Sequence, residues 1–204
     1  MSEINMLEIE NSLYAEGYEL VCGVDEAGRG PLAGPVCAAA VILPRGLEIP
    51  GLNDSKKLTD KKRRELFPVI QEKALAWGIG WASHEEIDEI NILQATYLAM
   101  ERAIAQLNVK PEYLLIDGNR TKDFGITART VVKGDSLSAS IAAASILAKV
   151  SRDDKMLEMA EEYPQYGFEI HKGYGTKKHY EALREHGHSP IHRLSFLKKF
   201  YAKD

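Results

Sequence analysis

The sequence predicts an α/β fold in which a five-stranded mixed sheet is flanked by helices on both faces. Two observations predict this class. Three strand-like apolar segments follow one another through short connections, and alternating strands and helices come after them. Several of the predicted strands also end in acidic residues. Ligands of such sheets gather at the carboxyl ends of strands, so these acids indicate where a site lies.

The first predicted strand is the segment around which the rest is organised. Residues 1–18 are acidic and loosely amphipathic, which predicts a short lead-in helix. The apolar run 20–24 predicts a strand that ends in Asp25 and Glu26, followed by Gly28 and Gly30 around Arg29. Neighbouring strand residues point to opposite faces, so the two acids converge only if the strand ends or twists there, as Gly28 would permit. A polar strand end followed by a turn is the simpler interpretation.

The next elements are predicted as a strand, a loop, a helix and a strand. Residues 36–43 form an apolar run between two prolines, and its three consecutive alanines suggest that another element packs closely on it. The polar loop 50–58 carries Lys56 and Lys57. A basic helix is expected from Thr59 to Ala74, with a kink or restart at Pro68. Residues 75–82 alternate well enough for a third strand.

The second half predicts two more strands, each ending in an acid, and a long helix. Residues 83–86 fit a capping box that opens a helix to about Leu107. The strand 113–116 ends in Asp117, and the strand 126–132 leads to Asp135. A small-residue helix then runs from 137 to 150 and continues to about 161, and short helices follow from Tyr163 onward.

Length and charge indicate one domain with a basic C-terminal end. The 204 residues suit one domain with a small appendage, which we divide into a core of residues 1–162 and a C-terminal helical segment of residues 163–204. The net charge of −4 argues against a general nucleic-acid coat protein. Residues 163–204 nevertheless hold eight Lys or Arg against four Asp or Glu, and five of the six histidines. A local basic patch is sufficient for contact with phosphates.

The remaining composition suggests where the protein works. Cys22 and Cys37 lie in apolar runs without metal-binding spacing, so reduced buried thiols are expected, with a disulfide as the less favoured alternative. No charged and apolar leader opens the chain, and the longest apolar run is too short to span a bilayer. We therefore expect a soluble, cytoplasmic protein that acts as a monomer. The C-terminal histidines are too irregularly spaced for a zinc site and are expected at the surface or against the backbone.

Asp25, Glu26, Asp117 and Asp135 are the candidate catalytic and metal-binding residues. Carboxylates gathered at one sheet end repel one another and need a counter-charge, which hard divalent cations supply. Two such ions about 4 Å apart activate water and stabilise the leaving oxygen in phosphodiester cleavage. Simpler roles stay open for two of them, because Asp117 precedes a glycine and suits a turn, and Asp135 is a good N-cap candidate. The Gly28-Arg29-Gly30 stretch resembles a dinucleotide fingerprint only superficially, since prolines follow it.

Six segments in this order resemble bacterial type 2 ribonuclease H (ribonuclease HII). They are residues 24–35 (VDEAGRGPLAGP), 53–58 (NDSKKL), 115–118 (LIDG), 142–150 (AAASILAKV), 171–176 (HKGYGT) and 189–193 (SPIHR). The resemblance covers about residues 18–200 and implies a ribonuclease H-like fold with a C-terminal helical segment. It implies an endonuclease that hydrolyses the RNA strand of RNA–DNA hybrids and cuts at ribonucleotides embedded in duplex DNA, with two Mg²⁺ or Mn²⁺ ions, leaving 3'-hydroxyl and 5'-phosphate ends.

The resemblance also assigns site residues. It makes Asp25, Glu26, Asp117 and Asp135 the metal ligands, and it implies that Gly28, Arg29 and Gly30 contact the 2'-hydroxyl beside the scissile phosphate. It implies that Tyr174 stacks on the following deoxyribose; a buried structural tyrosine is the alternative. These roles suit the residues, because a 2'-hydroxyl distinguishes RNA from DNA and glycines let the backbone approach a sugar. Lys56 and Lys149 are expected to bind substrate, and the other candidates for phosphate contact are Lys57, Lys172, Lys177, Lys178 and Arg193.

Two other functions fit parts of the pattern. Type 3 ribonuclease H shares the catalytic core but carries an additional N-terminal substrate-binding domain, for which the 18 or so residues before the first strand leave no room. A non-catalytic module that binds hybrids would be expected to lack one of the acids, and all four are present.

Overall fold

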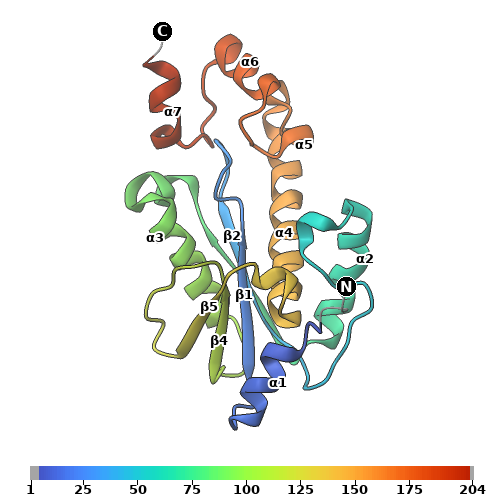
Figure 1. The fold of residues 1–204 in the computed structure, drawn as a ribbon. Coiled ribbons are helices and arrows are strands. Elements are labelled where there is room, and N and C mark those ends of the chain that lie inside the picture. The colour runs from blue at the N-terminus through green and yellow to red at the C-terminus, as the bar shows by residue number, and fades with distance from the viewer. Residues whose placement is uncertain (1–4, 203–204) are drawn as a thin grey trace.

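A five-stranded mixed sheet forms the centre of the computed structural model, which describes residues 5–202 (Figure 1). Its strands are β1 (Val21–Ala27), β2 (Val36–Ile42), β3 (Ala76–Ala82), β4 (Tyr113–Asp117) and β5 (Thr127–Val131). The spatial order is β3-β2-β1-β4-β5, with antiparallel pairs among the first three strands of the order and parallel pairs from β1 to β5. The predicted mixed α/β sheet is confirmed.

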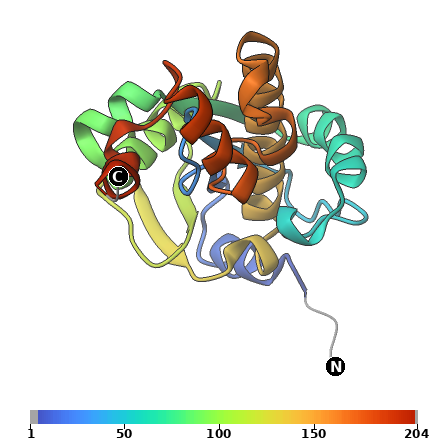
Figure 2. The ribbon, with the colours of Figure 1, turned by 90° about the horizontal axis from the view of Figure 1, so that it is seen from above.

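Helices cover both faces of the sheet (Figures 1 and 2). Helix α3 (His84–Ala105) packs on one face, and α2 (Asp60–Lys73) and α4 (Ala139–Glu162) pack on the other. Strand β2 shows why its sequence is apolar throughout: Ala38 and Ala40 belong to the core under α3, whereas Cys37 and Ala39 belong to the core under α2 and α4. A strand buried on both faces has no polar side.

Small residues let the helices approach the sheet closely. A Cβ placed on Gly23 of β1 would lie 2.1 Å from the main-chain carbon of Ser140 in α4. A Cβ on Gly80 of β3 would lie 2.1 Å from the carbonyl oxygen of Ala99 in α3. The alanines of β2 are fully buried between these layers, which confirms the expected close packing. A side chain at Gly80 would push α3 away from β3, and one at Gly23 would push α4 away from β1, the strand that carries Asp25 and Glu26.

The C-terminal segment lies beside one end of the sheet, next to the loop between β1 and β2 (Figures 1 and 2). It comprises the 3₁₀ turn η3 (Pro164–Tyr166), α5 (Phe168–His171), α6 (Lys177–His186) and α7 (Leu194–Tyr201). The main chain joins it to the loop, because Leu32 N donates to Gly173 O at 2.8 Å and Gly34 N donates to Ile191 O at 2.9 Å. The loop that follows the Asp25 strand is therefore held by residues more than a hundred positions away.

The remaining details mark where the structure differs from the predicted elements. The lead-in helix α1 covers Glu8–Ala15, and residues 1–4 of that prediction lie outside the described residues. Strand β1 does not end before the acids: Asp25 and Glu26 remain paired with Ala39 and Ala38 of β2.

The two long helices also differ in detail from expectation. Pro68 lies inside α2 without dividing it. Both Pro68 and Arg64, whose carbonyl loses its donor, are exposed, so water can replace the missing hydrogen bond. The capping box of Ser83 and Glu86 is confirmed. Helix α3 contains an unpredicted break at Asn91, where φ is 68°.

The two cysteines have the state expected from the sequence. Cys22 and Cys37 are buried and free, as predicted for reduced thiols. Among the helices of residues 5–202, none combines the length and the apolar composition that a membrane span requires.

Candidate metal centre and adjoining pocket

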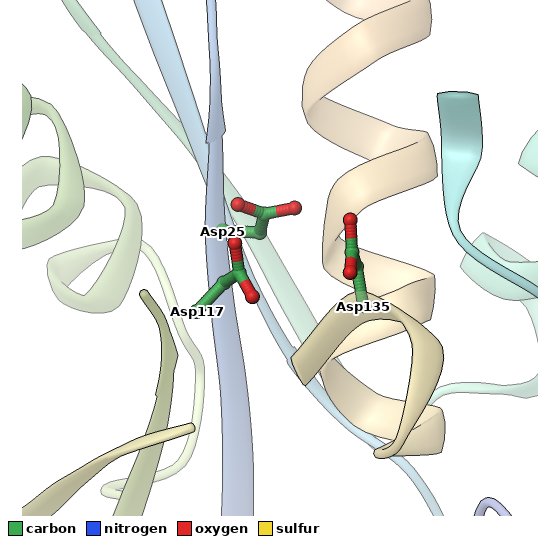
Figure 3. Close-up of side chains that lie close together, drawn as sticks. All are labelled: Asp25, Asp117 and Asp135. Atoms are coloured by element: carbon green, nitrogen blue, oxygen red, sulfur yellow. The ribbon is translucent and has the colours of Figure 1, made fainter. Parts of the chain in front are cut away.

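Three carboxylates from distant parts of the chain, those of Asp25, Asp117 and Asp135, lie close together (Figure 3). Asp25 lies in β1, Asp117 ends β4, and Asp135 lies in the 3₁₀ turn η2 (Gly134–Ser136) before α4. One carboxylate oxygen from each of the three lies within 4.8 Å of the other two. This spacing lets a single divalent cation contact all three side chains.

Sheet register and one turn position these acids. The parallel pair β1–β4 aligns Val24 with Ile116, so the residues that follow, Asp25 and Asp117, emerge side by side. Oδ1 of Asp117 accepts a hydrogen bond of 2.7 Å from the main-chain nitrogen of Gly134, next to Asp135. Helix α4 is capped by Ser138, whose side chain accepts from Ile141 N, so Asp135 is not the cap of that helix.

The charges of the three acids oppose one another. Burial, followed by the neighbouring charges of Glu26 and Asp117, raises the pKa of Asp25 well above its ordinary value. Burial and then the charge of Asp117 raise the pKa of Asp135. Carboxylate oxygens without a full set of counter-charges are the donor set that hard divalent ions such as Mg²⁺ and Mn²⁺ prefer. The residues present therefore fit such an ion.

Glu26 lies next to this group but on the other face of the sheet. It pairs with Ala38 of β2, which faces α3, whereas Asp25 pairs with Ala39, which faces α4. Its carboxylate lies 3.3 Å from Nη1 of Arg29. Burial raises the pKa of Glu26, and the charge of Arg29 opposes that rise. Because β1 continues through both acids, the structure brings Asp25, Asp117 and Asp135 together and leaves Glu26 outside the three-oxygen cluster.

A cavity of about 230 Å³ adjoins Asp25 and contains every predicted substrate-binding residue. Its lining includes Gly28, Arg29, Gly30, Lys56, Lys149 and Tyr174, together with Asp25 and Glu26. Tyr174 is 43% exposed, which excludes the alternative of a buried structural tyrosine. A larger cavity, of about 690 Å³, lies between α3 and α4 and contains none of the four candidate acids.

Cations accompany the acids in this pocket. Nζ of Lys56 lies 3.6 Å from Oδ2 of Asp135, and its side chain is 78% exposed. Burial opposes the protonated form of Lys56, but the charges of Asp25 and Asp135 raise its pKa overall. Lys149 forms an ion pair of 2.7 Å with Asp153 in α4. Lys56 is thus available both to the acids and to a phosphate.

The structure corrects one sequence-based expectation in the C-terminal segment, for Arg193, and bears out another, for three histidines. Arg193, a candidate for phosphate contact, is 0% exposed and donates to main-chain carbonyls. Of the histidines expected at the surface or against the backbone, His171, His179 and His192 are buried, and each bonds to main-chain atoms. Sequence reasoning also missed the buried Arg152. A signal existed for Arg193, because it lies within the motif of residues 189–193, but the motif does not reveal that it points inward.

Comparison with known proteins identifies the family. A family model described as Ribonuclease HII matches residues 22–199. The chain belongs to the ribonuclease HII family. A ribonuclease HII of Endomicrobium trichonymphae is 58% identical over 193 residues, covering 94% of this chain and 92% of that protein. A ribonuclease HII of Aliivibrio fischeri is 60% identical over 183 residues, covering 90% of this chain and 88% of that protein.

Solved structures agree on the fold of this ribonuclease HII. The ribonuclease H2 of Pyrococcus horikoshii is 26% identical, with a TM-score of 0.72 and coverage of 90% of this chain and 99% of that one. A structure described as Bst-RNase HIII in complex with Mn²⁺ shares the fold at 20% identity and a TM-score of 0.69, covering 90% of this chain and 69% of that one. Both support a ribonuclease H-like fold.

Family membership establishes the class of activity. Ribonuclease HII is a nuclease and a hydrolase, and the family match supports endoribonuclease activity on RNA–DNA hybrids. Two other functions fitted the sequence. Type 3 ribonuclease H is disfavoured, because the matching family model and the relatives at 54–60% identity are all described as ribonuclease HII. A non-catalytic hybrid-binding module does not agree with membership in an enzyme family.

Proposed function

We propose that this ribonuclease HII hydrolyses the RNA strand of RNA–DNA hybrids and cuts at ribonucleotides embedded in duplex DNA, by a two-metal-ion reaction that leaves 3'-hydroxyl and 5'-phosphate ends. The observation that carries the proposal is the convergence of three carboxylate oxygens within 4.8 Å of one another, beside a pocket that holds Arg29, Lys56 and Tyr174. Acids alone would repel a phosphodiester, so cations at the same site are required for it to bind.

Asp25, Asp117 and Asp135 would hold one divalent ion, Mg²⁺ or Mn²⁺. Asp25 and Glu26 are the residues we assign to a second ion; because their side chains leave opposite faces of β1, the Glu26 carboxylate would have to turn toward Asp25 when that ion binds. Bound in this way, two ions lower the pKa of a water molecule and stabilise the charge on the leaving oxygen. The hydrogen bond from Gly134 N to Asp117 fixes the plane of that carboxylate. This fixed orientation supports a site with little reorganisation on binding.

The basic side chains of the pocket would bind the phosphates of the substrate. Arg29 has a 50% exposed side chain and can bind a phosphate through two nitrogens. Lys56, with its ammonium 3.6 Å from Asp135, is suited to a phosphate that approaches the acids. Lys149 lies on the same pocket wall but is paired with Asp153, so its contribution depends on exchanging that partner.

Recognition of the ribose would fall to the turn formed by residues 28–30. Gly28 has φ of 97°, a conformation that side chains rarely adopt, so the turn exposes backbone rather than a side chain. A Cβ on Gly30 would lie 3.6 Å from the ring of Tyr174, which places the turn and the ring next to each other. A 2'-hydroxyl on the turn and the following deoxyribose against the ring would then distinguish RNA from DNA.

The C-terminal segment, residues 163–204, would complete the substrate-binding surface, with the core of residues 1–162 supplying the acids. Tyr174 comes from this segment, and the segment is hydrogen-bonded to the loop after β1. The partner is an RNA–DNA hybrid or a DNA duplex containing a ribonucleotide. One copy of the chain supplies every residue named here, so a monomer suffices for the reaction.

A labelled duplex with one embedded ribonucleotide tests the proposal. Cleavage is expected with Mg²⁺ or Mn²⁺ and none with a chelator, and the products should carry 3'-hydroxyl and 5'-phosphate ends. Asp117→Asn should abolish cleavage, whereas Glu101→Gln, at a surface ion pair with Lys122, should not change it. A mobility shift without cleavage by the wild-type protein would instead support a binding module and would contradict the proposal.

A further inference from the structure

Arg193 holds the turn of the substrate pocket from beneath. Its guanidinium is 0% exposed, and its three nitrogens donate to Gly28 O at 2.7 Å, to Arg29 O at 3.0 Å and to Gly34 O at 2.9 Å. Burial lowers the pKa of Arg193 to about 9. Arg193 forms no ion pair with a carboxylate of residues 5–202. Its charge is therefore met by main-chain oxygens of the loop and by the ring of Phe196, whose centroid lies 5.2 Å from Cζ.

A second buried arginine supports the same loop. Arg152 of α4 is 1% exposed and donates to Pro35 O at 3.0 Å, to Ala33 O at 3.3 Å and to Lys172 O at 3.1 Å. A Cβ on Gly28 would lie 1.9 Å from Nε of Arg152, so only glycine fits above this side chain. Together the two arginines bind five carbonyls of the loop between β1 and β2 and one carbonyl near Tyr174.

His192, the residue before Arg193, is linked through His179 to Tyr174, which lines the other wall of the pocket. Nδ1 of His192 accepts from Ser189 N at 2.8 Å, so the neutral ring carries its proton on Nε2. That Nε2 lies 2.9 Å from Nε2 of His179, and Nδ1 of His179 lies 2.9 Å from the carbonyl oxygen of Tyr174. Because a carbonyl only accepts, His179 donates through Nδ1 and accepts through Nε2. Every donor in this series of hydrogen bonds, from Ser189 to Tyr174, thus has an acceptor.

Burying the guanidinium groups of Arg152 and Arg193 costs folding free energy, so their geometry must bring a compensating benefit. Two guanidinium charges without carboxylate partners destabilise a core that apolar residues would fill at lower cost. A planar guanidinium can, however, hold three carbonyls in one fixed arrangement along its fork, whereas the three donors of an ammonium rotate about a single nitrogen. Two of the three carbonyls that Arg193 holds here, those of Gly28 and Arg29, belong to the turn of residues 28–30, which lies next to Tyr174.

We propose that His192 and Arg193 form a positioning dipeptide that sets the separation of the two pocket walls. Arg193 positions the turn of residues 28–30, and His192, acting through His179, positions Tyr174. Neither side chain touches the substrate. The inference rests on the proposed function, and it names the residues that give the same site its selectivity for a ribonucleotide over a deoxyribonucleotide.

The first test replaces the guanidinium while keeping its charge. The preference for binding a duplex with one ribonucleotide over an all-DNA duplex is measured in Ca²⁺. In Arg193→Lys this preference should fall about tenfold, as expected when a buried guanidinium that donates three hydrogen bonds is lost. Affinity for the all-DNA duplex should stay unchanged. Arg102→Lys is the matched control, because Arg102 pairs with Glu86 and Trp81 far from the pocket. A preference unchanged in Arg193→Lys would overturn the role of Arg193.

The second test is a double-mutant cycle for the role of His192 in positioning Tyr174, and it remains decisive if Arg193→Lys does not fold. His192→Gln and Tyr174→Ala should each reduce kcat/KM at a single ribonucleotide, and the double variant should lose no more than Tyr174→Ala alone. Fully additive losses would mean that His192 does not act through Tyr174 and would overturn its proposed role. If the wild-type protein does not cleave, the proposed function fails instead, so the two failures are distinguishable.

Discussion

Asp117 and Gly134 are joined by a hydrogen bond of 2.7 Å from the main-chain nitrogen of Gly134 to Oδ1 of Asp117. This contact links the end of β4 to the turn that carries Asp135. Two of the three clustered acids are therefore positioned by one bond. A Cβ on Gly134 would lie 2.5 Å from Cδ1 of Ile141 and 3.3 Å from Oδ1 of Asp117.

Gly134→Ala should therefore disturb the acid cluster. The turn must shift to accommodate the methyl group, and we expect cleavage and Mn²⁺ affinity to fall by about 10-fold to 100-fold, the range seen when a ligand-orienting contact is lost. Titration calorimetry with Mn²⁺ and a cleavage assay measure both. Gly46→Ala is the control, since Gly46 has φ of 72° with open space around it and should affect stability alone. Equal Mn²⁺ affinity in both variants would contradict the orienting role.

Asp25→Asn should separate catalysis from stability. Burial and neighbouring negative charge raise the pKa of Asp25, so its ionised form strains the metal-free protein. We expect cleavage to be lost by more than about a hundredfold, because a proposed metal ligand is removed, while the melting temperature in a chelator stays equal or rises. A thermal melt with and without Mn²⁺ checks this. A large drop in the melting temperature without metal would argue against a cluster of opposing charges.

The buried histidines should make the protein sensitive to acid. Burial is the main cause that lowers the pKa of His179 to about 4 and that of His192 to about 3. An unfolded histidine has a pKa of about 6.5, so the unfolded chain takes up protons first as the pH falls. The stability that these residues contribute is therefore complete above about pH 6.5 and declines toward pH 4 to 3, by about 1.4 kcal/mol for each unit of pKa difference.

Urea unfolding at several pH values between 7 and 4 measures this effect. The raised pKa values of Asp25 and Asp135 act in the opposite direction, since those groups favour the folded state as the pH falls. Comparison with variants removes their contribution. The loss of stability on acidification should be smaller in His192→Gln than in the wild type and unchanged in His186→Gln, whose side chain is exposed. The same pH dependence in all three proteins would exclude the buried histidines as its source.

Tyr174→Ala should impair one substrate more than another. The ring is exposed beside Gly30, so its loss removes a contact surface and leaves the core intact. Stacking of a base on an aromatic ring contributes about 1–3 kcal/mol, and a sugar contact of the same size corresponds to about a 5-fold to 150-fold decrease in cleavage at a lone ribonucleotide. Binding of plain duplex should change little. Equal losses in cleavage and in plain duplex binding would indicate a structural role.

Binding to duplex should depend only weakly on salt. The chain carries a net charge of −4, and its basic groups near the acids are few. Since the salt slope follows the number of phosphates that are neutralised, we expect a slope of about −2 to −4 when the logarithm of the association constant is plotted against the logarithm of the salt concentration, rather than the value near −10 of an extended contact. Affinity measured from 50 to 300 mM KCl checks this. A steep slope, which would indicate the release of many ions, would contradict a local basic patch.

The acids could be placed from the sequence because strand ends are visible in it. The run before Asp117 is apolar and stops at a glycine, and ligands collect at the ends of parallel strands, so Asp117 and Asp25 were expected to meet. The direction of Glu26 was not predictable in this way. It depends on whether β1 ends before the acids, and that is decided by pairing with β2, a neighbour that the local pattern does not show.

The inward position of Arg193 and the pairing of two buried histidines with each other escaped prediction for a different reason. Arg193 looks like any basic residue of a phosphate-binding surface, and only the packing of the C-terminal segment on the loop of residues 28–35 reveals that it points inward. His179 and His192 show no regular spacing, because their partners are main-chain atoms and each other. Long-range contacts of this kind leave no periodic signal in a single sequence.

Diffraction from crystals soaked in Mn²⁺, with anomalous difference maps, tests the central claim most directly. We predict a strong anomalous peak that is coordinated by carboxylate oxygens of Asp25, Asp117 and Asp135, and its loss in Asp117→Asn. Crystals that show these three side chains apart, with no anomalous peak between them at saturating Mn²⁺, would contradict the account.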